Sequence, residues 1–159
     1  MEDQTQDILK ISQDLLSFLS VADDTTVEVS FNSEENTYSI AIQTQNPSLL
    51  IGYHGENLAA MQNIISQHVF AKQSSWPTLT INVNDYREKR LTAVTALADS
   101  AVSRVIATGQ AHSLPPMPAN ERRLVHMHLQ DHPQVTTASE GIGRSRGIII
   151  SPKPETVSS

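Results

Sequence analysis

The sequence predicts an α+β fold in which two small units follow one another along a chain of 159 residues. Hydrophobic periodicity over residues 1–84 gives the order helix, strand, strand, helix, helix, strand. A long amphipathic helix then opens a second, smaller unit of helices and strands over residues 85–153. The length suits one average domain or two small ones. We expect the polar residues 154–159 to form a disordered tail.

The first three elements follow from apolar spacing. Ile8, Ile11 and Leu15 recur at helical intervals, so residues 4–20 are expected to form an amphipathic helix. Apolar and polar residues alternate over 27–31 and again over 38–42, with a polar stretch between them. This pattern predicts a β-hairpin after the helix.

Two helices separated by glycines come next. Asn46 and Pro47 suit the N-cap and first position of a short helix, which Gly52 ends. A second helix is expected to begin at Glu56, with its apolar residues on one face. Residues 79–83 alternate again and predict a third strand.

The second unit begins with the longest predicted helix, residues 85–108, which Gly109 should end. A proline-rich connector follows at 114–118. Asn120 is expected to cap a helix carrying residues 122–130. Short strands are predicted near 134–138 and 146–151, joined by a glycine-rich segment at 141–143.

The charge distribution restricts the function. The net charge of −6 argues against a general nucleic-acid binder, because Lys and Arg supply most of the non-specific affinity for phosphate. Residues 1–83 hold ten acids and two bases, whereas residues 84–159 hold seven acids and nine bases. A basic cluster can still attract phosphate when acidic surface lies beyond the Debye length of roughly 8 Å. Any electrostatic binding site should therefore lie in the second half.

Composition also predicts location. The chain has no cysteine, which excludes disulfides and thiolate chemistry and is compatible with a reducing cytosol. Its longest apolar runs are a few residues, so no membrane span is expected. The acidic N-terminus lacks the features of a signal peptide. We expect a cytoplasmic protein.

Gly52-Tyr53-His54-Gly55 is the first motif that suggests a binding site. The two glycines allow close backbone approach, and the N–H groups opening the next helix point toward whatever lies above the turn. The element order and the residues around this motif closely resemble a type II KH domain over about residues 3–84. The resemblance implies a loop that clamps about four nucleotides of a single strand.

This loop departs from the usual KH pattern, which places Lys or Arg between the glycines. Tyr53 could stack on a base, and a protonated His54 could contact phosphate. The alternative is a degenerate KH domain that serves mainly in protein contacts.

The second motif is Glu121-Arg122-Arg123-Leu124-Val125-His126. Arg122 and His126 are four residues apart on a predicted helix, so a guanidinium and an imidazole emerge on one face, as suits a phosphate and its base. This motif, with Asp85–Arg90, Leu114–Met117, Thr136–Gly141 and Ser151–Lys153, resembles in order the R-three-H domain of the Jag family. Proteins of that family, also called KhpB, join a KH domain to an R-three-H domain.

The resemblance implies that Arg122 and His126 are the named arginine and histidine of that domain. It makes Arg123, Arg144, Arg146 and Lys153 additional candidate phosphate contacts. The alternatives are that Arg122 pairs with an acid while His126 caps or packs, and that Arg144 and Arg146 only punctuate a mobile hairpin.

We therefore expect a single-stranded RNA-binding protein, a post-transcriptional regulator or RNA chaperone, with single-stranded DNA open as a second ligand. The alternative is a protein-interaction module whose acidic KH half docks on a small single-domain KH protein, on a larger complex or on itself. No cofactor, membrane partner or enzymatic activity is expected. His126, His128 and His132 lie close together but match no metal-ligand pattern. Many Jag proteins begin with an additional N-terminal domain, which we expect this chain to lack.

Overall fold

The computed structural model describes residues 2–154, and all but Pro154 of the expected tail lies outside them. The chain divides into two compact units, Met1–Arg87 and Glu88–Ser159. The first contains α1 (Glu2–Phe18), β1 (Thr25–Asn32), β2 (Thr37–Thr44), α2 (Pro47–Ile51), α3 (Glu56–Gln73) and β3 (Leu79–Val83). The second is built from α4 (Tyr86–Thr108), β4 (His112–Ser113), α5 (Ala119–Leu129), β5 (Val135–Glu140) and β6 (Gly147–Pro152).

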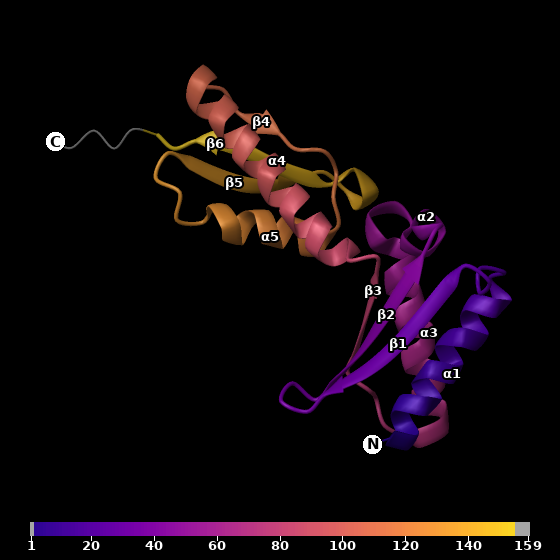
Figure 1. The fold of residues 1–159 in the computed structure, drawn as a ribbon. Coiled ribbons are helices and arrows are strands. Elements are labelled where there is room, and N and C mark those ends of the chain that lie inside the picture. Colours follow the sequence, from indigo (N-terminus) through magenta and orange to yellow (C-terminus); the bar gives the residue numbers. More distant parts are fainter. Residues whose placement is uncertain (1, 155–159) are drawn as a thin grey trace. The chain divides into compact units, whose positions relative to one another are not determined.

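The first unit is a three-stranded sheet with helices on one face (Figure 1). β1 and β2 form the predicted antiparallel hairpin, and β2 pairs with β3 in parallel. Along β2 buried and exposed side chains alternate, because successive side chains of a strand point to opposite faces. The buried set faces α1 and α3, while the opposite face of the strand is exposed.

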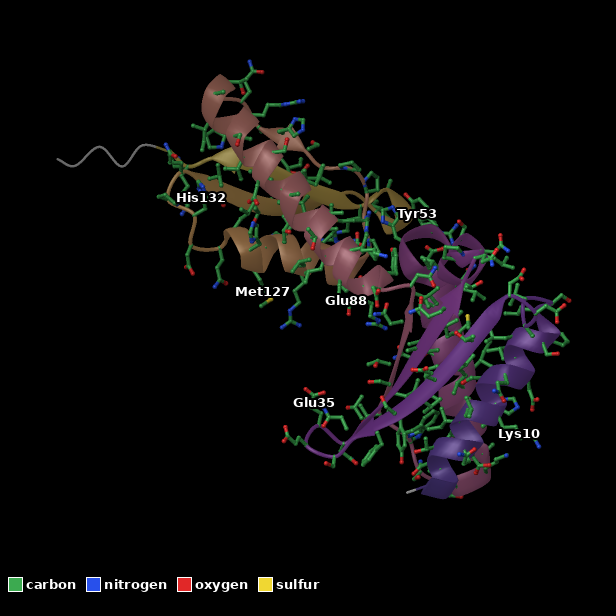
Figure 2. The ribbon with its side chains drawn as sticks, viewed as in Figure 1. Lys10, Glu35, Tyr53, Glu88, Met127 and His132 are labelled. Carbon is green, nitrogen blue, oxygen red and sulfur yellow. The ribbon has the colours of Figure 1, made fainter. Side chains whose placement is uncertain are left out.

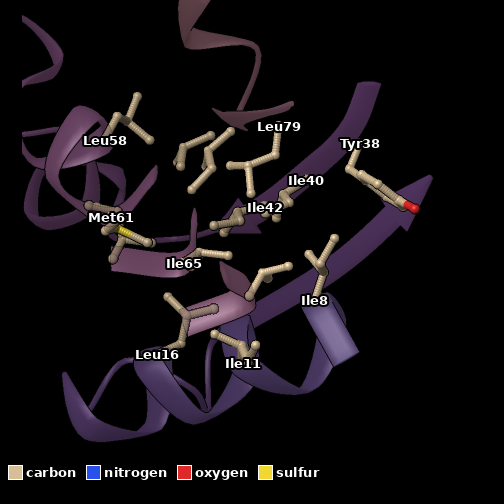
Figure 3. Close-up of a cluster of buried hydrophobic side chains, with 14 residues drawn as sticks. Ile8, Ile11, Leu16, Tyr38, Ile40, Ile42, Leu58, Met61, Ile65 and Leu79 are labelled. Carbon is tan, nitrogen blue, oxygen red and sulfur yellow. The ribbon is translucent and has the colours of Figure 1, made fainter. Parts of the chain in front are cut away.

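Mainly aliphatic side chains of the helices, β2 and β3 form the core of this unit (Figure 3), and partly buried residues of β1 pack against it. Ile8 of α1, Ile65 of α3 and the strand residues Ile42 and Ile81 are fully buried. Each such side chain stabilises the fold by roughly 1.5–3 kcal/mol relative to an exposed one. The core holds α3 against the sheet and thereby fixes the turn that precedes it.

The second unit has its own sheet, in the order β4-β6-β5 with antiparallel pairing. Ile148 and Ile150 of β6 share one face of the strand and belong to a buried cluster with apolar residues of α4 and α5. Figure 1 shows these elements. The predicted α+β class, helices and longer strands are confirmed. β4 was not predicted, because two residues carry no readable alternation.

One of the two predicted N-caps is wrong. α5 begins at Ala119, with Pro118 in the N-cap position, so Asn120 lies inside the helix. Pro118 accepts the first helical hydrogen bond from the backbone N–H of Arg122 at 3.0 Å, which starts the helix earlier than expected. Asn46 does occupy the N-cap position of α2, but its side chain makes no capping hydrogen bond.

α4 qualifies the expectation that no segment could span a membrane. Among residues 2–154, α4 is long and apolar enough to cross a membrane, judged by length and composition alone. This is weak support for a membrane role, because the core helix of a soluble domain has the same properties. Val94, Ala98 and Val105 of α4 are buried in the core of the second unit.

Candidate nucleic-acid interface

Arg122 and His126 lie on α5 beside the face that the helix buries. Glu121, Val125 and Leu129 are its buried residues, and Arg122 and His126 are half-buried. Their four-residue spacing places them on the same side of the helix, as predicted. Arg123 points outward and is exposed.

The guanidinium of Arg122 is held at the start of α5. Its Nη1 donates a hydrogen bond to the carbonyl of Met117 at 3.0 Å. The backbone N–H of Met117 in turn donates to the carbonyl of Arg146 at 3.2 Å. Met117 therefore links Arg122 to the segment that precedes β6.

His126 contacts the strand next to its helix. Its Nδ1 lies 2.7 Å from the hydroxyl of Thr137 on β5, in a hydrogen bond whose direction depends on the tautomer. This contact ties α5 to β5 through one ring nitrogen of His126. Among residues 2–154, no hydrogen bond is formed by its Nε2, which leaves that atom available to a ligand.

Arg146 is tied to the same face of β5. Its Nε donates to the hydroxyl of Ser139 at 2.9 Å. Thr137 and Ser139 are two residues apart, so their side chains share one face and lie about 7 Å apart along the strand. Arg122, His126 and Arg146 are therefore brought together by Met117 and by two hydroxyls of β5. We call these three residues the basic cluster.

The other candidates of this unit lie outside the basic cluster. Arg144 is exposed on the 3-10 turn at Gly143–Ser145, two residues before Arg146. Lys153 follows β6, whereas Arg146 precedes it, so about 20 Å of strand separates them. The Nζ of Lys153 donates to the carbonyl of His132 at 2.7 Å, just beyond the end of α5.

An ion pair that the sequence did not reveal fixes the start of α5. Arg90 of α4 contacts the carboxylate of Glu121 through Nε at 2.7 Å and through Nη2 at 2.9 Å. Glu121 is only 6% exposed. Because its charge is matched by Arg90, this acid next to Arg122 opposes phosphate binding less than an unpaired one would. Arg90 and Glu121 both lie in the family motifs, but no sequence pattern predicts an ion pair between residues 31 positions apart.

The glycine loop of the first unit is a tight turn between α2 and α3. Gly52 has φ 68° and ψ −169°, a conformation that essentially only glycine adopts. A Cβ at this position would lie 2.5 Å from Cγ of Asn57. The Nδ2 of Asn57 donates to the carbonyl of Leu49 at 2.7 Å and so bridges α3 back to α2. Gly55 follows as the N-cap of α3.

The two residues between the glycines form an aromatic pair. Tyr53 is 61% exposed and projects from the turn (Figure 2). Its ring meets the half-buried ring of His54 edge-on, with centroids 4.1 Å apart. His54 has a left-handed backbone with φ 51°. The loop offers an aromatic surface and backbone N–H groups but no permanently charged base.

The remaining charges of the first unit are mainly acidic. Lys72, one of the two bases in residues 1–83, forms an ion pair with Asp7 at 3.2 Å. The hydrogen bonds from Lys72 and Gln73 lower the pKa of the Asp7 carboxyl below its usual value. Lys72 therefore ties α3 to α1 and adds little to any phosphate site.

The neighbouring histidines do not assemble a metal site. The Nε2 of His128 lies 2.7 Å from Oδ1 of Asp99 on α4. The Nδ1 of His132 instead accepts the backbone N–H of Gln134. In the part of the chain that the structure describes, no three metal-ligating side chains come together.

Comparisons with known proteins match both units. A KH-domain model of the KhpA/KhpB type covers residues 10–81, and an R-three-H domain model covers residues 92–152. Fold and site therefore define a chain in which a KH domain is followed by an R-three-H domain.

Curated relatives extend the match across the two domains. The RNA-binding protein KhpB of Streptococcus pneumoniae is 31% identical over 147 residues, which cover 91% of this chain and 45% of the relative. The KhpB proteins of Lactiplantibacillus plantarum and Bacillus subtilis are 35% and 28% identical, over 78% and 79% of this chain and 38% and 62% of their own lengths. The chain belongs to the Jag, or KhpB, family. It spans about half the length of the curated relatives it matches.

Proposed function

We propose that this chain binds single-stranded RNA through α5 and the adjoining basic loop, with the glycine loop of the KH domain assisting. The observation that carries the proposal is the basic cluster, in which Arg122, His126 and Arg146 are held by Met117, Thr137 and Ser139. Guanidinium groups suit phosphate because their planar donors match its oxygens. The relatives' name, RNA-binding protein, supports the same ligand.

In this proposal the residues have unequal roles. Arg122, His126 and Arg146 form the centre, and the exposed side chains of Arg123 and Arg144 add phosphate contacts at its edge. Lys153 contacts a more distant part of the bound RNA strand. In the other domain Gly52 and Gly55 let RNA approach the backbone, while Tyr53 and His54 supply ring contacts.

We place the domain boundary at Asn84–Asp85, where two consecutive residues have positive φ between β3 and α4.

The proposed cellular role rests on RNA binding. The protein would act in the cytoplasm as a post-transcriptional regulator or RNA chaperone, without enzymatic activity or a cofactor. Single-stranded DNA of the same sequence, used as a competitor, would establish whether the 2′-hydroxyl contributes to binding.

Fluorescence anisotropy with a labelled single-stranded RNA tests the proposal. Arg122→Ala with Arg123→Ala should weaken binding by about tenfold or more, because charged hydrogen bonds to phosphate are lost. Gly52→Asp should weaken it less. Arg104→Ala, which removes an exposed arginine of α4 outside the basic cluster, serves as the charge control. Equal affinity of the double variant and the wild type would refute the proposal.

The acidic KH half favours a second function, a docking site for another KH protein or for a second copy of this chain. Its ten acids, two bases and uncharged loop make it a poor phosphate site. A docking module predicts complex formation with a purified single-domain KH protein in size-exclusion chromatography. It also predicts RNA affinity that is negligible or insensitive to salt, whereas phosphate binding is strongly salt-dependent.

A further inference from the structure

The loop between β5 and β6 carries an unusually exposed apolar side chain. Ile142 is 88% exposed, the largest value among the large apolar side chains of the described residues. Turn positions favour Gly, Asn, Asp, Ser and Pro, whereas isoleucine favours strands. A single exposed apolar residue needs no explanation by itself. The closed turn that presents Ile142 and the arginines beside it indicate a binding role for this side chain.

Hydrogen bonds close the loop around Ile142. Both the backbone N–H and the hydroxyl of Ser145 donate to the carbonyl of Ile142, at 3.1 and 2.8 Å. Gly141 has φ 98°, and a Cβ there would lie 2.8 Å from the carbonyl oxygen of Ser145. The backbone of 141 thus packs directly on that of 145. Ile142 is presented on a closed turn whose shape does not have to be created on binding.

The surroundings of this turn hold two arginines and one exposed acid, Glu140, so they are net positive, and they are continuous with the basic cluster. Arg144 lies on the turn, and Arg146 follows it with its guanidinium anchored to Ser139. The carbonyl of Arg146 is bonded to Met117, which also holds Arg122. Ile142 is therefore an apolar tip on an edge whose charge complements a phosphate backbone.

We propose that Ile142 packs against a nucleobase of the strand whose phosphates contact Arg144 and Arg146. Phosphate contacts hold a strand in place, whereas contacts with bases distinguish one part of it from another. The bases of a single strand are splayed out and accept apolar side chains, and isoleucine is among the residues that wedge between bases in other complexes. This inference rests on the proposed function and extends it from the phosphates to the bases.

The test compares a labelled single-stranded RNA with an abasic strand of equal length, using the full chain. Ile142→Ala should weaken RNA binding about five- to tenfold, as expected for removing most of one buried aliphatic side chain. Its affinity for the abasic strand should equal that of the wild type. Ile142→Phe should retain binding to RNA, because an aromatic ring also stacks on a base. Phe18→Ala, which truncates a side chain that is 85% exposed in the other unit, is the matched control.

The outcomes separate this inference from the proposed function. Equal RNA affinity of Ile142→Ala and wild type would overturn the base contact while leaving the basic cluster intact. An equal loss of affinity for the RNA and for the abasic strand would also overturn the base contact. A loss of self-association with RNA affinity unchanged would overturn it as well, because it would assign Ile142 to a protein partner. Failure of the wild type to bind any RNA would overturn the proposed function and this inference with it.

Discussion

Removing Arg90 should destabilise the second unit substantially. Arg90→Ala would leave the carboxylate of Glu121, which is only 6% exposed, without the two hydrogen bonds at 2.7 and 2.9 Å that match its charge. Breaking a fully buried ion pair costs about 3–5 kcal/mol. The Arg90 side chain is 31% exposed, so water can partly replace it. We therefore expect a smaller loss than for a fully buried pair, about 2–3 kcal/mol.

The single tryptophan makes the assay specific to one unit. Trp76 belongs to the first unit, so its fluorescence reports unfolding there, whereas far-UV circular dichroism reports both units. A loss of this size should lower the melting temperature of the second unit by about 10–20 °C. The midpoint followed by Trp76 fluorescence should stay at its wild-type value.

A double replacement provides the control. Arg90→Met with Glu121→Leu removes both charges and should lie much closer to wild type than Arg90→Ala, because no buried carboxylate is left unpaired. A melting temperature of Arg90→Ala within about 2 °C of wild type would refute the reasoning. So would a double variant as unstable as the single one.

Three further predictions concern binding and folding. RNA affinity should fall with salt, with a slope of log K on log salt of about −0.7 per phosphate contacted, and a flat titration would contradict this. Arg146→Ala should weaken RNA binding more than Lys153→Ala, and the reverse order in the anisotropy assay would move the site to the far end of β6. Gly52→Ala should cost the first unit about 1–3 kcal/mol in denaturation followed by tryptophan fluorescence, because its backbone conformation is closed to alanine.

A fourth prediction concerns pH. The pKa of Asp7 in the folded chain should lie below its unfolded value, because Lys72 and Gln73 donate hydrogen bonds to its carboxylate. The stability gained is present above the unfolded pKa of about 3.9 and is lost as pH falls through the folded value. An NMR titration of the Asp7 carboxyl checks this. Lys72→Ala should raise the Asp7 pKa, and an unchanged value would show that Lys72 is not the cause.

The fold was largely predictable because its elements are long and strongly patterned. The alternation through Ile40 and Ile42 predicted β2, and the glycines at 52 and 55 predicted the break between α2 and α3. The two-residue strand β4 depends on pairing with β6, a tertiary contact that leaves no local pattern. Residue type alone predicts Asn120 as a cap, because asparagine is a favoured N-cap, whereas Pro118 occupies that position in the structure.

Much less of the candidate site could be predicted, because hydrogen bonds between distant residues build it. The spacing of Arg122 and His126 was readable, but their contacts with Met117 and Thr137 were not. Residue types indicate which side chains can bind phosphate, whereas tertiary structure decides which of them act together.

The central claim is that RNA binds mainly at the basic cluster and less at the glycine loop. Titrating the isotopically labelled chain with single-stranded RNA, followed by amide NMR spectra, tests this most directly. We expect the largest and earliest shifts at residues 117–126 and 137–147, with smaller shifts at residues 52–57. Shifts confined to residues 52–57, with α5 and the loop before β6 unaffected, would contradict it.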